Sequence, residues 1–156
     1  MKRNKEIEVA PYVEINKYAG KWYEIGRYRH WYERNAYNVS AEYTLKDGYI
    51  EVVNRCEKGN KHIEIKGKAY VIPESGNAKL KVKFNWLMKG DYWIIDLDEN
   101  YQWAVVSNPS QTNLWILYRK PTIENEVLRP IVYRLVNRGF ELAKVHWTKQ
   151  TNTTEE

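Results

Sequence analysis

The feature that most limits how this chain can fold is a series of short stretches in which apolar and polar residues alternate. Alternation with a period of two is typical of β-strands that bury one face. It is clearest in residues 78–84, whose apolar face comprises Ala78, Leu80, Val82 and Phe84. Turn signals separate the stretches. Among them, Asp47-Gly48 strongly favours a tight hairpin turn.

Eight such stretches follow one another with short links. They are residues 22–28, 39–45, 49–56, 62–71, 78–84, 91–97, 101–107 and 114–119. Strands joined by hairpins form an antiparallel meander, and a meander of this size protects its edges best by closing into a barrel. The sequence therefore predicts an all-β fold, an eight-stranded antiparallel up-and-down β-barrel. The interior of such a barrel is large enough for one small apolar ligand.

The pattern changes its period after the eighth stretch. Apolar residues then recur three and four positions apart, which predicts one C-terminal amphipathic α-helix over residues 122–138. Thr122 is expected to cap its start, and Gly139 suits the position after its end. One apolar stripe has to be buried, so we expect the helix to pack on the outside of the barrel. Residues 145–147 favour a short last strand.

A length of 156 residues fits one domain. We expect a flexible leader over residues 1–10, a single domain over residues 11–150 and a flexible tail over residues 151–156. No apolar run is long enough to span a bilayer. Seven Trp and thirteen Tyr against two Phe suit a ligand cavity, because these rings combine an apolar body with a polar tip. An aromatic-rich core is the simpler alternative.

Charge and reactive residues exclude several classes of function. A net charge of +5 would suit nucleic acid or an anionic membrane surface. Lysines that alternate along one strand look instead like a solvated face, so we expect no nucleic-acid partner and leave peripheral membrane contact open. The three histidines lie far apart, and we expect no metal and no cofactor. No nucleophile and base set accompanies Cys56, so we expect no enzyme.

Three short motifs, in this order, resemble those of the lipocalins. They are Gly20-Lys21-Trp22 at the first strand, Leu97-Asp98-Glu99-Asn100-Tyr101 between the sixth and seventh strands, and Arg119 after the eighth. Longer segments resemble the bacterial lipocalin branch, which includes apolipoprotein D-like relatives. These segments are residues 18–25, 90–97 and 114–121. The resemblance covers about residues 11–147.

The resemblance implies a calyx that binds and transports a small hydrophobic ligand. It also implies that Arg119 packs over Trp22 beside Gly20 and closes the barrel base, in a cation–π contact worth about 0.5 to 2 kcal/mol. Relatives often carry a cysteine in the first loop that could pair with the position of Cys56. In this chain Ala36 occupies that first-loop position, so Cys56 is expected to be a free thiol. Such relatives are often exported to the periplasm or outer membrane, but this chain shows no export signal or lipidated cysteine, which leaves its location open.

Strand parity and the loop at the expected open end give a candidate ligand site. Its lining is expected to comprise Tyr28, Trp31, Tyr43, Asn54, Val82, Phe84 and Trp86. Arg29 and Arg34 at the rim would meet a carboxylate or phosphate head, with solvated loop charges as the alternative. The expected ligand is a long-chain fatty acid or a lysophospholipid, carried by a monomer or a homodimer. Alternatives are haem, a pigment or a dye in a natural or engineered pocket, and, less favoured, a lipid-modifying enzyme.

Overall fold

The computed structural model describes residues 6–29, 35–85 and 89–151. Its elements in chain order are α1 (Ile15–Tyr18), β1 (Gly20–Tyr28), β2 (Tyr37–Lys46), β3 (Tyr49–Lys58), β4 (Lys61–Val71), β5 (Lys79–Lys83), β6 (Lys89–Leu97), β7 (Trp103–Ser107), β8 (Leu114–Tyr118), α2 (Asn125–Asn137), the 3-10 helix η2 (Leu142–Lys144) and β9 (Val145–Trp147). The predicted eight strands, C-terminal helix and short last strand are confirmed. The short helix α1 was not predicted.

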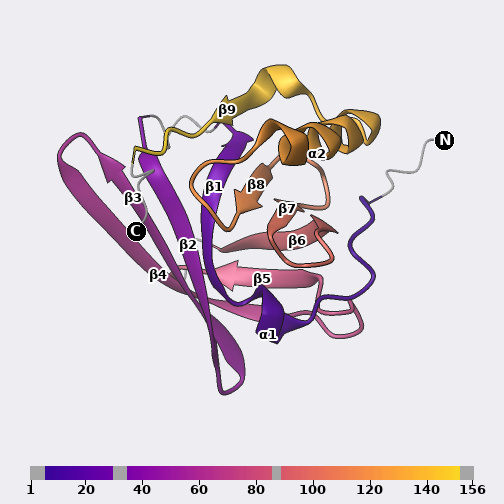
Figure 1. Cartoon of the computed structure of the whole chain (residues 1–156). Helices are drawn as coiled ribbons and strands as arrows, with labels where there is room; N and C mark the ends of the chain where they lie inside the picture. The colour runs from indigo at the N-terminus through magenta and orange to yellow at the C-terminus, as the bar shows by residue number, and fades with distance from the viewer. Residues whose placement is uncertain (1–5, 30–34, 86–88, 152–156) are drawn as a thin grey trace.

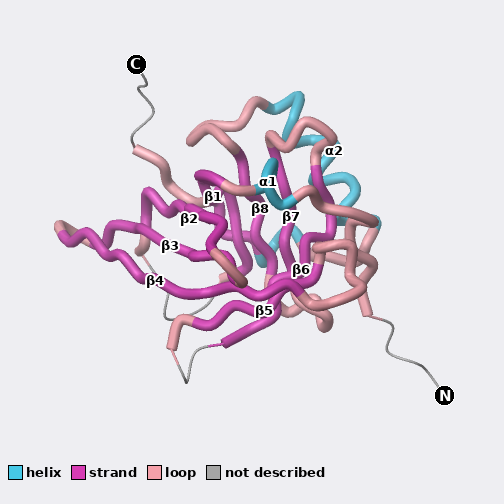
Figure 2. The backbone as a smooth tube through the Cα atoms, turned by 90° about the horizontal axis from the view of Figure 1, so that it is seen from below, coloured by secondary structure: helices cyan, strands magenta, loops and turns pink. Residues whose placement is uncertain are grey.

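The strands close into a barrel. Each strand from β2 to β7 pairs antiparallel with the next one, and β1 pairs with both β8 and β2. Figure 1 shows the strands wrapped around one interior, and Figure 2 shows them from below. The pairing of β1 with β2 ends at Tyr23, and farther along β1 pairs with β9 instead. The predicted antiparallel up-and-down barrel is therefore confirmed, with one seam that β1 and β2 do not close themselves.

Apolar side chains form two clusters, one inside the barrel and one beneath α2. The inner cluster includes Trp22, Tyr43, Leu80, Ile94, Val106 and Leu117. The outer cluster includes Trp93, Ile95, Leu114, Ile116, Ile131 and Leu135. Alternate residues of β6 and β8 thus contribute to different clusters, because both faces of these strands are covered. The prediction that the helix packs outside the barrel is confirmed (Figure 1).

A β-bulge makes one local prediction wrong. Strict alternation placed Tyr28 on the same face as Trp22, but the register between β1 and β8 shifts just after Glu24. A bulge adds one residue to a strand and reverses the parity beyond it. Tyr28 therefore packs in the outer cluster, with its ring centroid 5.9 Å from that of Phe140. Its hydroxyl accepts a hydrogen bond from the Glu141 N–H at 2.8 Å.

The predicted start of the C-terminal helix was also wrong. α2 begins at Asn125, with Glu124 in an extended conformation before it. Thr122 does not cap it, because the chain still bends through residues 119–122 after leaving β8. Gly139 follows the helix with a φ of +94°, a conformation that favours glycine.

The described part of the predicted leader is packed rather than loose. Ile7 is buried in the outer cluster and Ala10 in the inner one. The Ala10 N–H donates to the carbonyl of Ile94 in β6 at 2.9 Å. The chain is therefore tied to the barrel several residues before the predicted domain boundary.

One end of the barrel is closed by a tryptophan and an arginine. The Trp22 side chain is fully buried, and the Arg119 guanidinium carbon lies 3.7 Å from its ring centroid. Arg119 also donates to the carbonyls of Tyr101, Lys21 and Lys17 at 3.0, 2.9 and 2.8 Å. Gly20 has a φ of +102°, and a Cβ there would lie 3.4 Å from the guanidinium. These contacts join α1, β1 and the chain on either side of β7 and β8.

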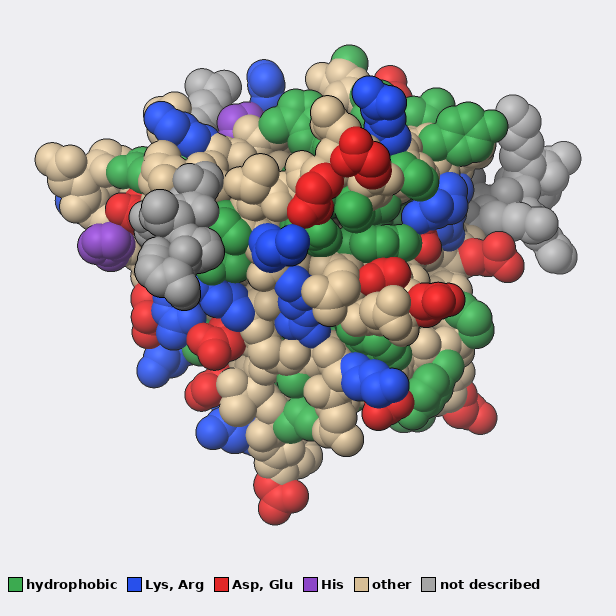
Figure 3. Space-filling view, in the orientation of Figure 1, with side chains coloured by type: hydrophobic (Ala, Val, Ile, Leu, Met, Phe, Trp, Pro, Cys, Tyr) green, Lys and Arg blue, Asp and Glu red, His purple; other side chains and the backbone are tan. Residues whose placement is uncertain are grey.

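Acidic and basic side chains are interspersed over the face in Figure 3. Across the described segments, no helix has both the length and the apolar character needed to cross a membrane.

Candidate functional site

The strand register shows which side chains face the barrel interior. Tyr43 in β2 opposes Val52 in β3, and Val52 in turn opposes Gly67 in β4. Two positions farther along the same strands, Asn54 opposes Ile65. Directly opposed residues share one face of a sheet, and Tyr43 and Val52 belong to the inner cluster. Asn54 and Ile65 therefore also face the interior.

The interior is packed near the closed end, whereas one inward-facing side chain farther along β4 is exposed. Ile65 is 45% exposed although it faces inward, whereas Ala69, four residues nearer the closed end of the same strand, is 2% exposed. Ile65 lies in the part of β4 that pairs only with β3, because the β4–β5 pairing begins at Lys68. The barrel therefore has a packed floor, and farther along β4 an apolar, inward-facing side chain is exposed.

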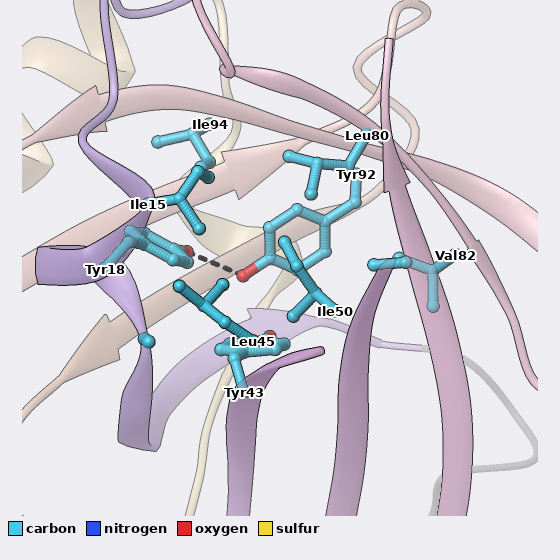
Figure 4. A pocket seen from close by; sticks show the side chains of 11 residues that line it. Ile15, Tyr18, Tyr43, Leu45, Ile50, Leu80, Val82, Tyr92 and Ile94 are labelled. Atoms are coloured by element: carbon cyan, nitrogen blue, oxygen red, sulfur yellow. Dashed lines mark hydrogen bonds between the residues drawn. The ribbon is translucent and has the colours of Figure 1, made fainter. Parts of the chain in front are cut away.

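A pocket in this floor lies between α1 and strands β2 to β6 (Figure 4). Its lining comprises Ile15, Tyr18, Ala19, Tyr43, Leu45, Ile50, Ala69, Leu80, Val82, Tyr92 and Ile94. The cavity measures about 10 Å³, which is space for about one water molecule. The floor is thus almost filled by side chains, and two residues expected to bind ligand, Tyr43 and Val82, line it.

Three tyrosines, called the floor tyrosines below, meet in this pocket: Tyr18, Tyr43 and Tyr92. The hydroxyls of Tyr18 and Tyr92 lie 2.6 Å apart, and Figure 4 shows the two rings pointing toward each other. The Tyr43 ring centroid is 5.8 Å from each of the other two. Burial raises the pKa of Tyr43 to about 12 and holds the pKa of Tyr18 and of Tyr92 well above its usual value. All three phenols are therefore neutral at physiological pH.

Phe84 lies against the inner face of β4. A Cβ added at Gly67 would stand 2.8 Å from the Phe84 ring and 2.6 Å from the Lys83 carbonyl oxygen. Only glycine leaves room for so close an approach of β5 and its ring. Phe84 is half-buried and packs against the inner cluster.

The structure describes only some of the residues that were expected at the mouth of the barrel. Trp31, Arg34 and Trp86 lie outside the described residues. Arg29 is exposed at the end of β1, and its backbone N–H donates to the Lys144 carbonyl at 3.4 Å. Tyr28 points away from the interior, as described above.

A buried ion pair is the main interior feature that the sequence did not predict. Glu24 and Arg27 are 5% and 3% exposed, and Arg27 Nη1 lies 2.7 Å from Glu24 Oε2. The Thr148 hydroxyl donates to the same carboxylate oxygen. Arg27 opposes Trp115, which packs against the inner cluster, so the bulge returns Arg27 to the inner face. Gly26 was the available signal, because glycine inside a strand often marks a bulge.

The seam between β1 and β2 is closed by residues 148–151, called the C-terminal strap below. The Gln150 side-chain amide donates to the carbonyls of Glu24 in β1 and Val39 in β2, at 2.9 and 3.0 Å. Figure 1 shows this segment running from β9 toward β2. The strap therefore completes the wall where the two strands separate.

Elsewhere the structure offers little for metal chemistry. Within residues 6–29, 35–85 and 89–151, no group of three or more His, Cys, Asp or Glu side chains is placed to hold a metal ion.

The closed floor, the apolar interior and the helix outside the wall together define a calyx, built on an eight-stranded antiparallel barrel. A family model described as a lipocalin-like domain matches residues 13–150. The chain belongs to the lipocalin family, and the resemblance predicted from its motifs is confirmed. Lipocalins are known for binding and transporting small hydrophobic ligands.

Relatives in plants and bacteria match over most of their length. The outer membrane lipoprotein Blc of Vibrio cholerae is 40% identical over 88% of this chain and 82% of its own. Temperature-induced lipocalin-1 of Arabidopsis thaliana is 37% identical over 100% of this chain and 89% of its own. Among solved structures, insecticyanin from the tobacco hornworm Manduca sexta superposes with a TM-score of 0.75 at 16% identity, covering 95% of this chain and 85% of its own. At that identity the likeness concerns the fold alone.

Proposed function

We propose that this protein is a non-enzymatic carrier of a long-chain fatty acid or a lysophospholipid. The observation that carries the proposal is a barrel closed at one end, with an apolar inner cluster and with Ile65 facing inward yet 45% exposed. Exposed apolar surface in a concave site is what an aliphatic chain can cover. Membership of the lipocalin family supports the same reading.

The energies are adequate for this class of ligand. Burying ~14 methylenes at about 0.8 kcal/mol each gains about 11 kcal/mol. A micromolar dissociation constant corresponds to about 8 kcal/mol, which leaves about 3 kcal/mol for ordering the chain. Because the floor has space for only about one water molecule, a chain that goes deeper has to displace inner side chains such as Phe84.

The polar head of the ligand belongs at the mouth in this proposal. Arg29 is exposed there at the end of β1, and Arg34 follows five positions later in the sequence. A guanidinium recognises a carboxylate or a phosphate through charge-assisted hydrogen bonds. The ion pair of Glu24 and Arg27 is internally neutral and buried, so it offers no net charge to a head group inside the barrel.

The test compares two glutamate substitutions on β4. Ile65 faces the barrel interior, and Tyr70 faces outward with a similar exposure of 39%. We expect a fluorescent fatty-acid probe to bind the unsubstituted protein with a saturable, near-stoichiometric isotherm and to be displaced by unlabelled fatty acid. Ile65→Glu should weaken binding at least about tenfold, because it removes apolar contact and repels the carboxylate.

Tyr70→Glu is the matched control and should leave the affinity within about twofold. Absence of a saturable site in the unsubstituted protein, or equal effects of the two substitutions, would contradict the proposed carrier function.

A further inference from the structure

The floor pocket has an unusual distribution of polarity. Eight of its lining residues are apolar, namely Ile15, Ala19, Leu45, Ile50, Ala69, Leu80, Val82 and Ile94. The only polar side-chain atoms are the hydroxyls of the floor tyrosines, Tyr18, Tyr43 and Tyr92. They come from α1, β2 and β6, so closure of the barrel brings them together in an otherwise apolar space (Figure 4).

Hydrogen-bond counting shows that these hydroxyls are incomplete as a group. Each phenol has one O–H donor and can also accept. The Tyr18 and Tyr92 hydroxyls share one hydrogen bond at 2.6 Å, and the Tyr43 ring centroid lies 5.8 Å from each of the other two. A chain of three hydroxyls has at most two links, so at least one of the three hydrogens needs another acceptor. The lining contributes no other side-chain acceptor for the third, and leaving a buried donor without an acceptor is costly.

An oxygen atom in the cavity would complete the group. The cavity of about 10 Å³ is the size that one water oxygen needs. A ligand that reaches the floor can replace such a water without loss only if it brings an oxygen of its own. A purely aliphatic chain end would displace the water and leave the third hydroxyl hydrogen without a partner.

The oxygen has to be uncharged. The lining contains no cationic side chain, and the Arg119 guanidinium is already stacked on Trp22 and bonded to backbone carbonyls. The raised pKa of each floor tyrosine, caused first by burial, shows that this environment disfavours negative charge. A carboxylate would meet the same penalty.

We propose that the floor tyrosines form a subsite for an uncharged oxygen, a hydroxyl or carbonyl, at the far end of an aliphatic ligand whose charged head stays at the mouth. The proposal rests on the carrier function above and makes it more specific. The preferred ligands are chains with oxygen at both ends, such as hydroxylated fatty acids, rather than simple ones.

The experiment measures the affinity of saturated fatty acids of increasing length, each beside its terminally hydroxylated counterpart, by calorimetry or probe displacement. We expect at least one length at which the hydroxylated acid binds about threefold to tenfold tighter than the plain acid. The added hydroxyl makes the ligand more soluble in water, so a non-specific apolar site would show the opposite order.

Tyr92→Phe removes the central hydroxyl and keeps the ring, and it should abolish the preference for the hydroxylated acid. Tyr43→Phe and Tyr18→Phe serve the same purpose if Tyr92→Phe fails to fold. The matched control is Tyr70→Phe, because this tyrosine lies on the outer face of the same barrel. It should leave the preference unchanged.

Two outcomes overturn the subsite while leaving the carrier function in place. In one, plain acids bind saturably but no length favours the hydroxylated form. In the other, a preference exists but persists in every folded phenylalanine variant. Absence of saturable binding by any acid would overturn both proposals together.

Discussion

Trp22 is fixed by contacts of different kinds. Its indole N–H donates to the Tyr18 carbonyl at 2.8 Å, and its ring lies between the Arg119 guanidinium and the Tyr18 ring, whose centroid is 5.1 Å away. The Gly20-Lys21-Trp22 motif therefore belongs to the closed end of the barrel, as the resemblance implied. Arg119 lies nearly a hundred positions away in the chain, and its side chain also donates to four backbone carbonyls.

Substitution of Trp22 tests this structural role. Trp22→Ala is expected to lower the free energy of unfolding by about 3 to 5 kcal/mol, as for other large truncations in a core. Urea denaturation followed by fluorescence of the remaining tryptophans measures the change. Trp147→Ala, at a site that is 46% exposed, should cost much less. An unchanged midpoint for Trp22→Ala together with lost probe binding would assign Trp22 to the ligand instead.

At the level of elements, the C-terminal strap completes the barrel wall. β1 and β2 separate beyond Tyr23, and the strap bonds to both of them. The Asn38 N–H of β2 donates to the Lys149 carbonyl at 2.8 Å. Thr148 also bonds to β1, and Thr151 to Asn38. Because only two backbone–backbone hydrogen bonds among the described residues join this short segment to β1 and β2, it is expected to open more readily than the strands beside it.

Gln150→Ala removes two of the hydrogen bonds across the seam. We expect a loss of about 1 to 2 kcal/mol in stability and faster hydrogen exchange at the Asn38 amide, measured by NMR. Lys149→Ala is the neighbouring control, because the Lys149 side chain is exposed and only its carbonyl joins the seam. Equal exchange rates at Asn38 in Gln150→Ala and the unsubstituted protein would show that the backbone alone holds the strap.

For the molecule as a whole, the floor tyrosines make stability fall at alkaline pH. The pKa of Tyr43 is raised to about 12 in the folded chain and is about 10 when unfolded. Between these values the unfolded chain releases a proton that the folded chain keeps. The contribution of Tyr43 to the free energy of unfolding is therefore complete below about pH 10. It is lost as the pH rises toward 12, which lowers the stability by about 2 to 3 kcal/mol.

Denaturation by urea at about pH 9 and about pH 11 measures this loss. Tyr43→Phe should show a smaller decrease between the two conditions, whereas Tyr118, whose pKa is also raised by burial and by its bond to Glu124, contributes equally to both proteins. Identical decreases in the two proteins would show that Tyr43 ionises as easily in the fold as in the unfolded chain.

The sequence was most informative where one local pattern repeats. Period-two alternation located all eight strands and the change of period located α2, because each pattern follows from which face is buried. The alternation did not predict the bulge in β1, because one extra residue reverses the parity of every position beyond it. That shift misplaced Tyr28 and concealed the pairing of Glu24 with Arg27.

The floor pocket was harder to predict for a different reason. Tyr43 and Val82 were expected inside from strand parity, and they line the pocket. Tyr18 lies on a helical turn too short to leave a periodic signal, and Tyr92 on a strand that is apolar on both faces. Their meeting depends on closure of the barrel between segments more than seventy residues apart, which no local pattern encodes.

The position of the C-terminal strap also bears on the order of events during synthesis. The strap leaves the ribosome after every strand from β1 to β9. Until then a nascent chain exposes the Glu24 and Val39 carbonyls along an open edge, which the strap later covers. Unpaired strand edges can recruit a neighbouring chain. Pairing of two partly made barrels through this seam is therefore open to them until residue 150 has emerged and covers the two carbonyls.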